Sequence, residues 1–249
     1  MTTALVTGAS GGIGLEIARV LAGEHDLVLV ARSAEGLAEA SAAVGGATVL
    51  ALDLAAPGAV ARIVDAVPDI DCLVNNAGVG DFAPFAEADP DKLDTLIALN
   101  IGALTQLTRA YLPGMLARKR GRILNVASTA AFQPGPLMAV YYATKAYVLS
   151  LSEALAEETR GSGVTVTALC PGPTASGFQA GAAMEGSRLV RGRTLPTASS
   201  VAAYGVAAMR KGDAVAVPGL MNKVFASSIR LTPRPIVRRV VHRMQSSTD

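Results

Sequence analysis

The sequence is poor in the residue types that build metal sites, disulfide frameworks and aromatic cores. Tryptophan is absent, aromatic residues make up only 4% of the 249 residues, and there are two cysteines and two histidines. Cys72 and Cys170 both border apolar runs, so we expect buried, reduced thiols. No paired carboxylates and no His/Cys/Asp cluster indicate a metal site. The core must therefore consist mainly of Ala, Val, Leu and Ile.

The sequence also lacks a strong charge excess and a long apolar run. The formal net charge is +2, which gives no general case for a nucleic-acid partner. No uninterrupted apolar stretch of about 18 residues occurs, so we expect no transmembrane helix. The N-terminus has no basic-then-apolar signal pattern. With 51% hydrophobic and 17% charged residues, the chain is predicted to be a folded, soluble, cytoplasmic protein.

What the chain does contain is a regular alternation of short β-branched runs and Ala/Leu-rich segments. The expected strands cover residues 3–7, 26–31, 47–52, 70–74, 121–127, 164–169 and 213–217. The segments with helical spacing cover residues 14–21, 36–44, 59–67, 92–117 and 141–159. Strand runs that are apolar throughout indicate a sheet covered on both faces. The pattern predicts an α/β fold with a single Rossmann-type, doubly wound parallel sheet of about seven strands and helices on both faces.

The chain shows no composition break or low-complexity linker before residue 175, so we expect one domain over residues 1–219. Residues 175–192 are Gly/Ala-rich with weak periodicity. Such a segment between a strand and a helix is typical of a loop that closes over a site. We predict that this loop contacts the substrate, and that residues 220–249 form an extension.

A glycine-rich turn follows the first expected strand, in the sequence TGASGGIG. Gly8, Gly12 and Gly14 remove side chains where the backbone must turn tightly, and the next helix points its N–H groups at the same place. This favours a pyrophosphate site, although the spacing is not G-x-G-x-x-G and a tight turn without a ligand is the alternative. Ligands of such sheets bind at the carboxyl ends of the strands. Five later strands of the predicted sheet also carry small, polar or glycine residues at their carboxyl ends, within the sequences VARS, ALDL, VNNAG, VAS and CPGPT.

The stretch VYYATKAY, residues 140–147, places tyrosines beside a lysine. Tyr141 and Lys145 are spaced (i, i+4) on one helix face and can act on the same group. Tyr142, at (i, i+3), is not excluded by that geometry. Taken alone, an aromatic residue near a lysine is more typical of packing beside a solvated charge than of chemistry.

Together these motifs resemble the short-chain dehydrogenase/reductase family over residues 3–219. The resemblance rests on TGASGGIG, NNAG at 75–78, Asn100 in ALNIG, Ser128 in VAST, Tyr141 and Lys145 as Y-x-x-x-K, and PGPT at 171–174. It implies that Asn100, Ser128, Tyr141 and Lys145 are catalytic. Tyr141, thirteen residues after Ser128, takes the family's catalytic place, which leaves Tyr142 to packing or pocket lining.

The resemblance implies hydride transfer between a nicotinamide and a carbonyl or alcohol, with Tyr141 as general acid/base. A phenol has a pKa of about 10, which a neighbouring Lys145 ammonium is expected to lower. By the same resemblance, Lys145 holds the nicotinamide ribose. Ser128 hydrogen-bonds the substrate oxygen, and Asn100 holds a water that relays protons to Lys145.

The end of the second strand bears on the cofactor. NAD-binding enzymes usually carry an acidic residue there, whereas this chain has Ala31, Arg32 and Ser33, which favours NADP(H) over NAD(H). The glycine turn lacks the second basic residue of many NADP-using relatives. The cofactor-binding residues that the resemblance implies are Gly8, Ser10, Gly12, Ile13, Gly14, Arg32, Ser33, Asp53, Leu54, Asn76, Ala77, Gly78, Tyr141, Lys145, Pro171, Gly172 and Thr174.

The expected substrate is a moderately hydrophobic carbonyl or alcohol, because the stretches 79–85 and 129–140 are mostly apolar. The apolar residues expected to face it are Phe82, Phe85, Phe132, Leu137 and Met138; the alternative, which we expect for at least two of them, is a place in the core. We therefore predict an NADP(H)-dependent carbonyl reductase or alcohol dehydrogenase that forms a homo-oligomer, a dimer or tetramer. The alternatives are an NAD-dependent alcohol dehydrogenase and a non-catalytic cofactor-sensing regulatory protein.

The extension over residues 220–249 carries six Lys/Arg and one acidic residue. Apolar residues recur at helical spacing after Pro235, which suits a helix start; they are Ile236, Val237, Val240, Val241 and Met244. The pattern predicts a basic amphipathic helix. It either packs on the protein's own surface or a neighbouring subunit, or rests on an anionic membrane.

Overall fold

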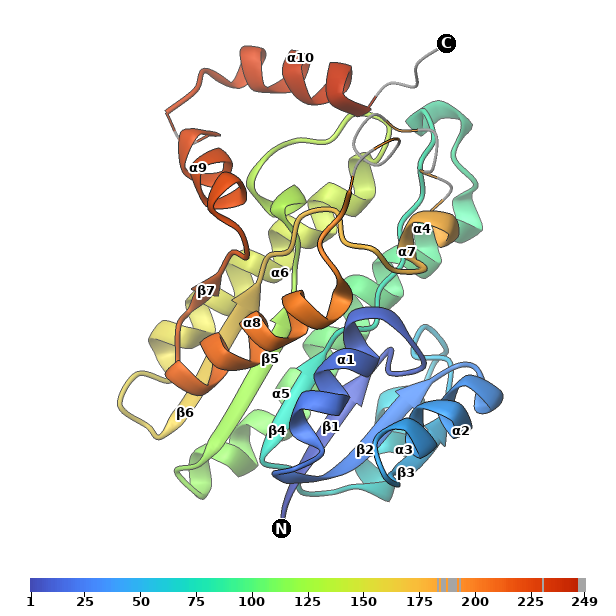
Figure 1. Cartoon of the computed structure of the whole chain (residues 1–249), viewed down its shortest axis with the longest axis vertical. Helices are drawn as coiled ribbons and strands as arrows, with labels where there is room; N and C mark the ends of the chain where they lie inside the picture. Colours follow the sequence, from blue (N-terminus) through green and yellow to red (C-terminus); the bar gives the residue numbers. More distant parts are fainter. Residues whose placement is uncertain (183, 185–186, 188–191, 193, 230, 246–249) are drawn as a thin grey trace.

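The computed structural model describes residues 1–182, 184, 187, 192, 194–229 and 231–245. A single parallel sheet runs through the molecule in the strand order β3-β2-β1-β4-β5-β6-β7 (Figure 1). The strands are β1 (Thr2–Thr7), β2 (His25–Ala31), β3 (Thr48–Ala51), β4 (Cys72–Asn75), β5 (Gly121–Val126), β6 (Val164–Leu169) and β7 (Val215–Ala216). The predicted seven-stranded parallel sheet is confirmed.

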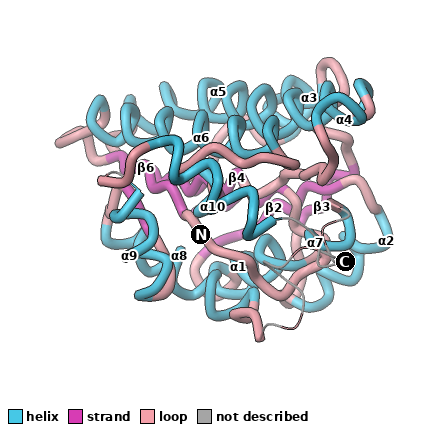
Figure 2. Tube along the Cα trace, turned by 90° about the horizontal axis from the view of Figure 1, so that it is seen from above, coloured by secondary structure: helices cyan, strands magenta, loops and turns pink. Residues whose placement is uncertain are grey.

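Helices cover both faces of the sheet, as its apolar strands require. Figure 2 shows α1 (Gly12–Leu21), α2 (Ala34–Ala43) and α8 (Ala198–Lys211) on one side. The other side carries α3 (Ala59–Ala66), α4 (Pro90–Ile97), α5 (Leu104–Ala117) and α6 (Ala139–Glu158). Shorter elements are η1 (Phe85–Glu87), η3 (Thr129–Phe132) and α7 (Phe178–Gly181). The doubly wound arrangement is therefore confirmed.

The helix predicted over residues 92–117 is not continuous. Asp89 caps α4 and Pro90 occupies its first turn, an ordinary helix start. A π-helical segment, η2 (Ala98–Ala103), then separates α4 from α5. The hydrophobic spacing could not show this break, because it depends on hydrogen bonds from Asn100 to a distant segment.

Two helices follow the last strand and lie beyond the carboxyl edge of the sheet (Figure 1). The predicted basic helix is α10 (Arg234–Gln245), whereas α9 (Leu220–Ile229) was not predicted. Val237 and Val241 of α10 are buried in a cluster with Tyr141 and Tyr142 of α6. The helix thus packs on the protein's own surface. No helix in the described part of the chain is long and apolar enough to cross a membrane.

Both cysteines are buried, as predicted. Burial raises the pKa of Cys72 and of Cys170 to about 12, so both thiols stay protonated near neutrality. Among the described residues, no group of three His, Cys, Asp or Glu could hold a metal ion.

Candidate active site

The turn after β1 packs two of its glycines, Gly8 and Gly14, against the segment that follows β4. Gly8 and Gly12 have φ angles of 64° and 54°, a conformation that residues with a side chain rarely adopt. A Cβ atom on Gly8 would lie 2.8 Å from Asn76 Nδ2, and one on Gly14 would overlap the Gly8 carbonyl oxygen. Glycine is therefore needed at these positions for α1 to start this close to the strand ends.

Hydrogen bonds hold the turn in place. Asn76 Nδ2 donates to the carbonyl oxygens of Thr7 at 3.0 Å and Gly8 at 3.1 Å. Thr7 Oγ1 accepts from the backbone N–H groups of Asn76 and Ala77. In the described part of the chain, no side chain caps α1, whose N-cap residue is Gly11. The first N–H groups of α1 are thus available to an anion such as a pyrophosphate.

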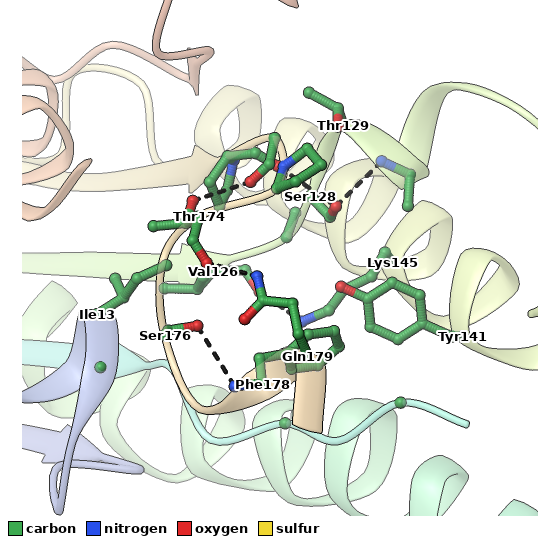
Figure 3. Close-up of a pocket in the computed structure, with 18 of the residues that line it drawn as sticks. Ile13, Val126, Ser128, Thr129, Tyr141, Lys145, Thr174, Ser176, Phe178 and Gln179 are labelled. Atoms are coloured by element: carbon green, nitrogen blue, oxygen red, sulfur yellow. Dashed lines mark hydrogen bonds between the residues drawn. The ribbon is translucent and has the colours of Figure 1, made fainter. Parts of the chain in front are cut away.

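A cavity of about 700 Å³ lies where these strand ends meet, within the size range of small-molecule and cofactor sites. Figure 3 shows Ile13, from α1, on one side of the pocket, and Tyr141 and Lys145, from α6, on the other. The predicted site residues that line it are Gly8, Ser10, Gly12, Ile13, Arg32, Asn76, Ala77, Gly78, Ser128, Tyr141, Lys145, Pro171, Gly172 and Thr174.

Three of the predicted catalytic side chains meet in this cavity. Ser128 follows β5, and its Oγ accepts a hydrogen bond from the Ala130 N–H at 3.1 Å; the Ser128 hydroxyl acts to lower the pKa of Tyr141. Tyr141 lies in the first turn of α6, and Lys145 follows one turn later. Lys145 Nζ donates to the Val126 carbonyl oxygen at 2.8 Å and lies 5.8 Å from the centre of the Tyr141 ring. A polar group of a ligand could reach all three side chains.

Burial has the largest effect on the pKa values of Tyr141 and Lys145. It raises the pKa of Tyr141 well above its ordinary value, although the hydrogen bond with Ser128 works in the other direction. It lowers the pKa of Lys145 to about 8. The Tyr141 pKa therefore moves opposite to the lowering expected from Lys145. The physical reason is that the loss of water around the phenolate outweighs the lowering by the Ser128 hydroxyl.

The fourth predicted catalytic residue, Asn100, is buried but does not line the cavity. Its Nδ2 donates to the Val79 carbonyl oxygen at 2.9 Å and to Thr144 Oγ1 at 3.1 Å. Its Oδ1 accepts from the Val79 N–H at 3.0 Å. The side chain therefore ties the segment after β4 to η2 and α6. That Asn100 holds a water stays a prediction.

Four predicted cofactor-binding residues also lie outside the cavity lining. Gly14 serves the close packing of α1, and Leu54 is buried in the core. Ser33 Oγ accepts from the Gly36 N–H and caps α2, while Asp53 Oδ1 accepts from the Ala55 N–H at 3.0 Å. Their positions in the family motifs predicted a role in cofactor binding. The contacts that they make in this structure instead stabilise the packing and turns of the protein itself.

The C-terminal helices supply one wall of the cavity, which the sequence did not predict. Met221, Asn222 and Phe225 come from α9, and Val241 and Met244 from α10. A stripe of apolar residues on a helix predicts that one face is buried, but it does not identify the surface that buries it. That surface depends on the path of the chain after β7.

Tyr142 connects this wall to α6. Its hydroxyl accepts a hydrogen bond from Gln245 Nε2, at the end of α10. Gln245 is fully buried, and a Cβ atom on Gly135 would overlap the Tyr142 ring. Tyr142 therefore lines the pocket and anchors α10, in agreement with its predicted packing role.

The predicted substrate-facing residues are mostly placed elsewhere. Met138 lines the cavity, whereas Phe82, Phe85, Phe132 and Leu137 do not. Phe82 and Phe132 pack against buried clusters, and Phe85 is 67% exposed. The prediction was wrong for these four, because apolar composition alone does not show which way a loop residue points.

The predicted substrate loop, residues 175–192, borders the cavity in its described part. The members that line it are Ser176, Gly177, Phe178, Gln179, Gly181 and Met184. Residues 183, 185–186 and 188–191 of this segment lie outside the described residues. Phe178 packs on Tyr141 with ring centres 5.3 Å apart, so the loop shields the tyrosine.

Comparison with known proteins identifies the family. A family model described as short chain dehydrogenase matches residues 2–185, and the chain belongs to this family of oxidoreductases. It is 37% identical over 179 residues to the ketoacyl reductase HetN of Nostoc sp.. That match covers 68% of this chain and 62% of HetN, less than two thirds of the relative's length.

Solved structures agree over more of the chain. A short-chain dehydrogenase from Sphingobium yanoikuyae, in complex with NADPH, is 30% identical with a TM-score of 0.81 and covers 93% of this chain and 95% of its own. A bulky-bulky ketone specific alcohol dehydrogenase from Comamonas testosteroni is 27% identical with a TM-score of 0.79, and 93% of each chain is covered.

Proposed function

We propose that this protein is an NADP(H)-dependent reductase that interconverts a bulky hydrophobic carbonyl compound and its alcohol, with Tyr141 as the general acid/base. The observation that carries the proposal is one cavity that joins an uncapped helix start and glycine turn to Ser128, Tyr141 and Lys145. The likeness to the NADPH-bound structure supports the cofactor class.

The residues present fit a dinucleotide. The positive φ angles of Gly8 and Gly12 form the tight turn that leads into the uncapped start of α1, so the pyrophosphate would accept hydrogen bonds from the N–H groups of this turn. Thr174, Pro171 and Gly172 would hold the nicotinamide end. When bound, NADPH supplies the hydride that reduces the carbonyl carbon.

The choice of NADP(H) over NAD(H) rests on Arg32. This residue follows β2, is exposed, and lines the cavity. An arginine there can donate charge-assisted hydrogen bonds to a 2′-phosphate. In the described part of the chain, no acidic side chain lines the cavity, so the usual partner of an NAD ribose is missing.

The chain's own residues would manage the proton. Ser128 Oγ would hydrogen-bond the substrate oxygen and hold it within reach of the Tyr141 hydroxyl. Because burial keeps the Tyr141 pKa high, this phenol carries a proton near neutrality and can donate it as the oxygen gains negative charge. Lys145, with a pKa of about 8, can release and regain a proton at the same pH. These properties favour carbonyl reduction.

The apolar side chains of the cavity support a bulky hydrophobic substrate. Flexible thioethers and aromatic rings line part of it, from Met138, Met184, Met221, Met244, Phe178 and Phe225. Methionine adapts to irregular apolar shapes, so this wall would accept a large apolar group beside the carbonyl. The likeness to a dehydrogenase specific for bulky ketones supports the same class.

The test is to follow NADPH absorbance with a panel of aldehydes and ketones of increasing size, with NADH in parallel. Consumption of NADPH by large ketones is the expected result. Tight NADPH binding without turnover of any member would favour the cofactor-sensing alternative, and preference for NADH would favour the NAD-dependent one. Light scattering tests the homo-oligomer, and cell fractionation the cytoplasmic location; both remain parts of this proposal.

A further inference from the structure

Exposed apolar side chains gather on the C-terminal helices. Of the twelve large hydrophobic side chains that are exposed in the described part of the chain, six lie between residues 220 and 240; they are Leu220, Met221, Val224, Leu231, Ile236 and Val240. Leu220 is 76% exposed and Leu231 89%. Single exposed apolar residues are ordinary, but a cluster marks an interaction surface.

The same helices carry positive charge without negative charge. From residue 214 to 248 the chain contains six Lys/Arg and no Asp or Glu. Arg234, Arg238 and Arg239 are exposed and form no ion pair with any residue that the structure describes. Elsewhere, five surface arginines pair with carboxylates, among them Arg118 with Asp69 and Arg210 with Glu24. Four exposed arginines scattered over other elements form no ion pair with a described residue; they are Arg32, Arg62, Arg109 and Arg122.

This surface adjoins the mouth of the cavity. Met221 lines the cavity yet is 80% exposed, so it lies at the opening. On α10, Val237 and Val241 are buried toward the cavity, whereas Ile236 and Val240 face outward. Seen from above, α10 lies in front of the sheet with α9 beside it (Figure 2). One pair of helices thus separates the cavity from a surface that is both apolar and cationic.

We propose that α9 and α10 form a docking surface for an anionic lipid bilayer, through which the active site receives a carbonyl substrate dissolved in the membrane. The substrate part rests on the proposed reductase function; the docking part does not. Exposed apolar side chains would enter the region between headgroups and acyl chains, and the arginines would bind lipid phosphates and carboxylates.

A second copy of the chain is the other candidate occupant, and the charge argues against it. A two-fold contact places the same patch on both partners. Arg234, Arg238 and Arg239 of each copy would then oppose like charges, with no carboxylate among the described residues of α9 and α10 to compensate. An anionic bilayer matches both properties of the surface.

The experiment is co-sedimentation of the full-length protein with vesicles of equal parts phosphatidylserine and phosphatidylcholine, and with vesicles of phosphatidylcholine alone. Binding to the anionic vesicles at low salt is expected, with loss at about 1 M salt, where the Debye length falls to about 3 Å. The double variant Arg238→Gln/Arg239→Gln should weaken binding about 25-fold, since each basic residue near the surface contributes about fivefold.

The matched control is Arg62→Gln/Arg109→Gln, which removes two exposed charges from α3 and α5, outside the C-terminal helices. It should leave vesicle binding unchanged. A second variant, Ile236→Ser/Val240→Ser, should also weaken binding although it changes no charge. No binding by the unmodified protein, or equal loss in the control, would overturn the proposal. A change in oligomeric mass with Ile236→Ser/Val240→Ser, without vesicle binding, would assign the surface to a second copy.

Turnover measurements test membrane docking and substrate reduction separately. A water-soluble aldehyde should be reduced equally by the unmodified protein and by Arg238→Gln/Arg239→Gln. A long-chain ketone held in the anionic vesicles should be reduced more slowly by the variant. Vesicle binding with no turnover of either compound would leave the docking surface standing and refute the reductase. Equal turnover of the ketone by both proteins would refute delivery from the membrane.

Discussion

The two ends of the cavity are built in different ways. At the proposed cofactor end, the glycine turn and Asn76 come from short motifs that are recognisable in the sequence, and so do Tyr141 and Lys145 of α6. At the proposed substrate end, the wall comes from α9 and α10, which follow the last strand and fold back over the cavity. The local backbone conformation specifies the first region. The second region depends on which distant surface the amphipathic helix α10 packs against. Chemistry and substrate choice should therefore respond to different mutations.

The largest expected effect separates the chemistry from binding. Tyr141→Phe removes the proposed proton donor, so kcat should fall by about 10²–10⁴-fold, the usual range for general acid catalysis. NADPH binding, measured by fluorescence titration, should remain. Tyr142→Phe is the matched control and should keep most activity, because its hydroxyl bonds Gln245 rather than Ser128. Reversed effects would show that the motif register is wrong.

A change confined to the cofactor end should alter the choice of cofactor alone. Arg32→Ala should raise the KM for NADPH by about 10- to 100-fold, since a charge-assisted hydrogen bond contributes about 1.5–3 kcal/mol. The KM for NADH and the order of preference among ketones should stay the same. Steady-state kinetics with both cofactors measures this. An unmodified enzyme that uses both cofactors equally would contradict the role of Arg32.

A change confined to the proposed substrate end should alter the use of bulky ketones and leave cofactor binding unchanged. Gln245→Ala removes the hydrogen bond that ties α10 to Tyr142. The KM for a bulky ketone should rise about fivefold, the contribution of one buried hydrogen bond. The kcat for a small aldehyde and the KM for NADPH should not change. If both fell together, Gln245 would support the whole cavity rather than its substrate end.

The smallest effect is a pH dependence of stability that Lys145 introduces. Its pKa of about 8 in the folded protein lies below the ordinary value of about 10.4. Between these values Lys145 binds more protons in the unfolded chain, so this residue makes the free energy of unfolding rise with pH, by at most about 1.4 kcal/mol per pH unit. Cys72 and Cys170 act in the opposite direction, because burial raises the pKa of both thiols. Urea unfolding of the protein without cofactor and of Lys145→Met, at pH 8 to 9.5, therefore gives the Lys145 contribution as the difference between the two slopes. An unchanged slope in the variant would contradict the burial effect.

Variants of the membrane-docking surface also test whether the two ends of the cavity act independently. It lies on the substrate end alone, so its variants should affect delivery of an apolar substrate and leave the Arg32-dependent cofactor choice untouched. A loss of NADPH preference in Arg238→Gln/Arg239→Gln would show that the two ends are coupled.

Most of the architecture followed from the sequence by itself, and so did three of the four side chains predicted to be catalytic, which line one cavity. Continuous apolar runs require a sheet covered on both faces, and all seven predicted strands are present. The positive φ angles at Gly8 and Gly12 explain why glycines stand there. The (i, i+4) spacing of Tyr141 and Lys145 placed both on one helix face because helix geometry is local.

Only the tertiary structure decided the rest, because it depends on contacts between distant segments. The π-helical segment at Asn100 depends on hydrogen bonds to Val79, twenty-one residues earlier. The pKa of Tyr141 follows from desolvation, which no spacing reveals. The apolar stripe of α10 predicted a helix with a buried face, but the path of the chain after β7 brought that face to Tyr142. Local sequence determined which titratable side chains share one helix face, and long-range packing determined which helices close the cavity around them.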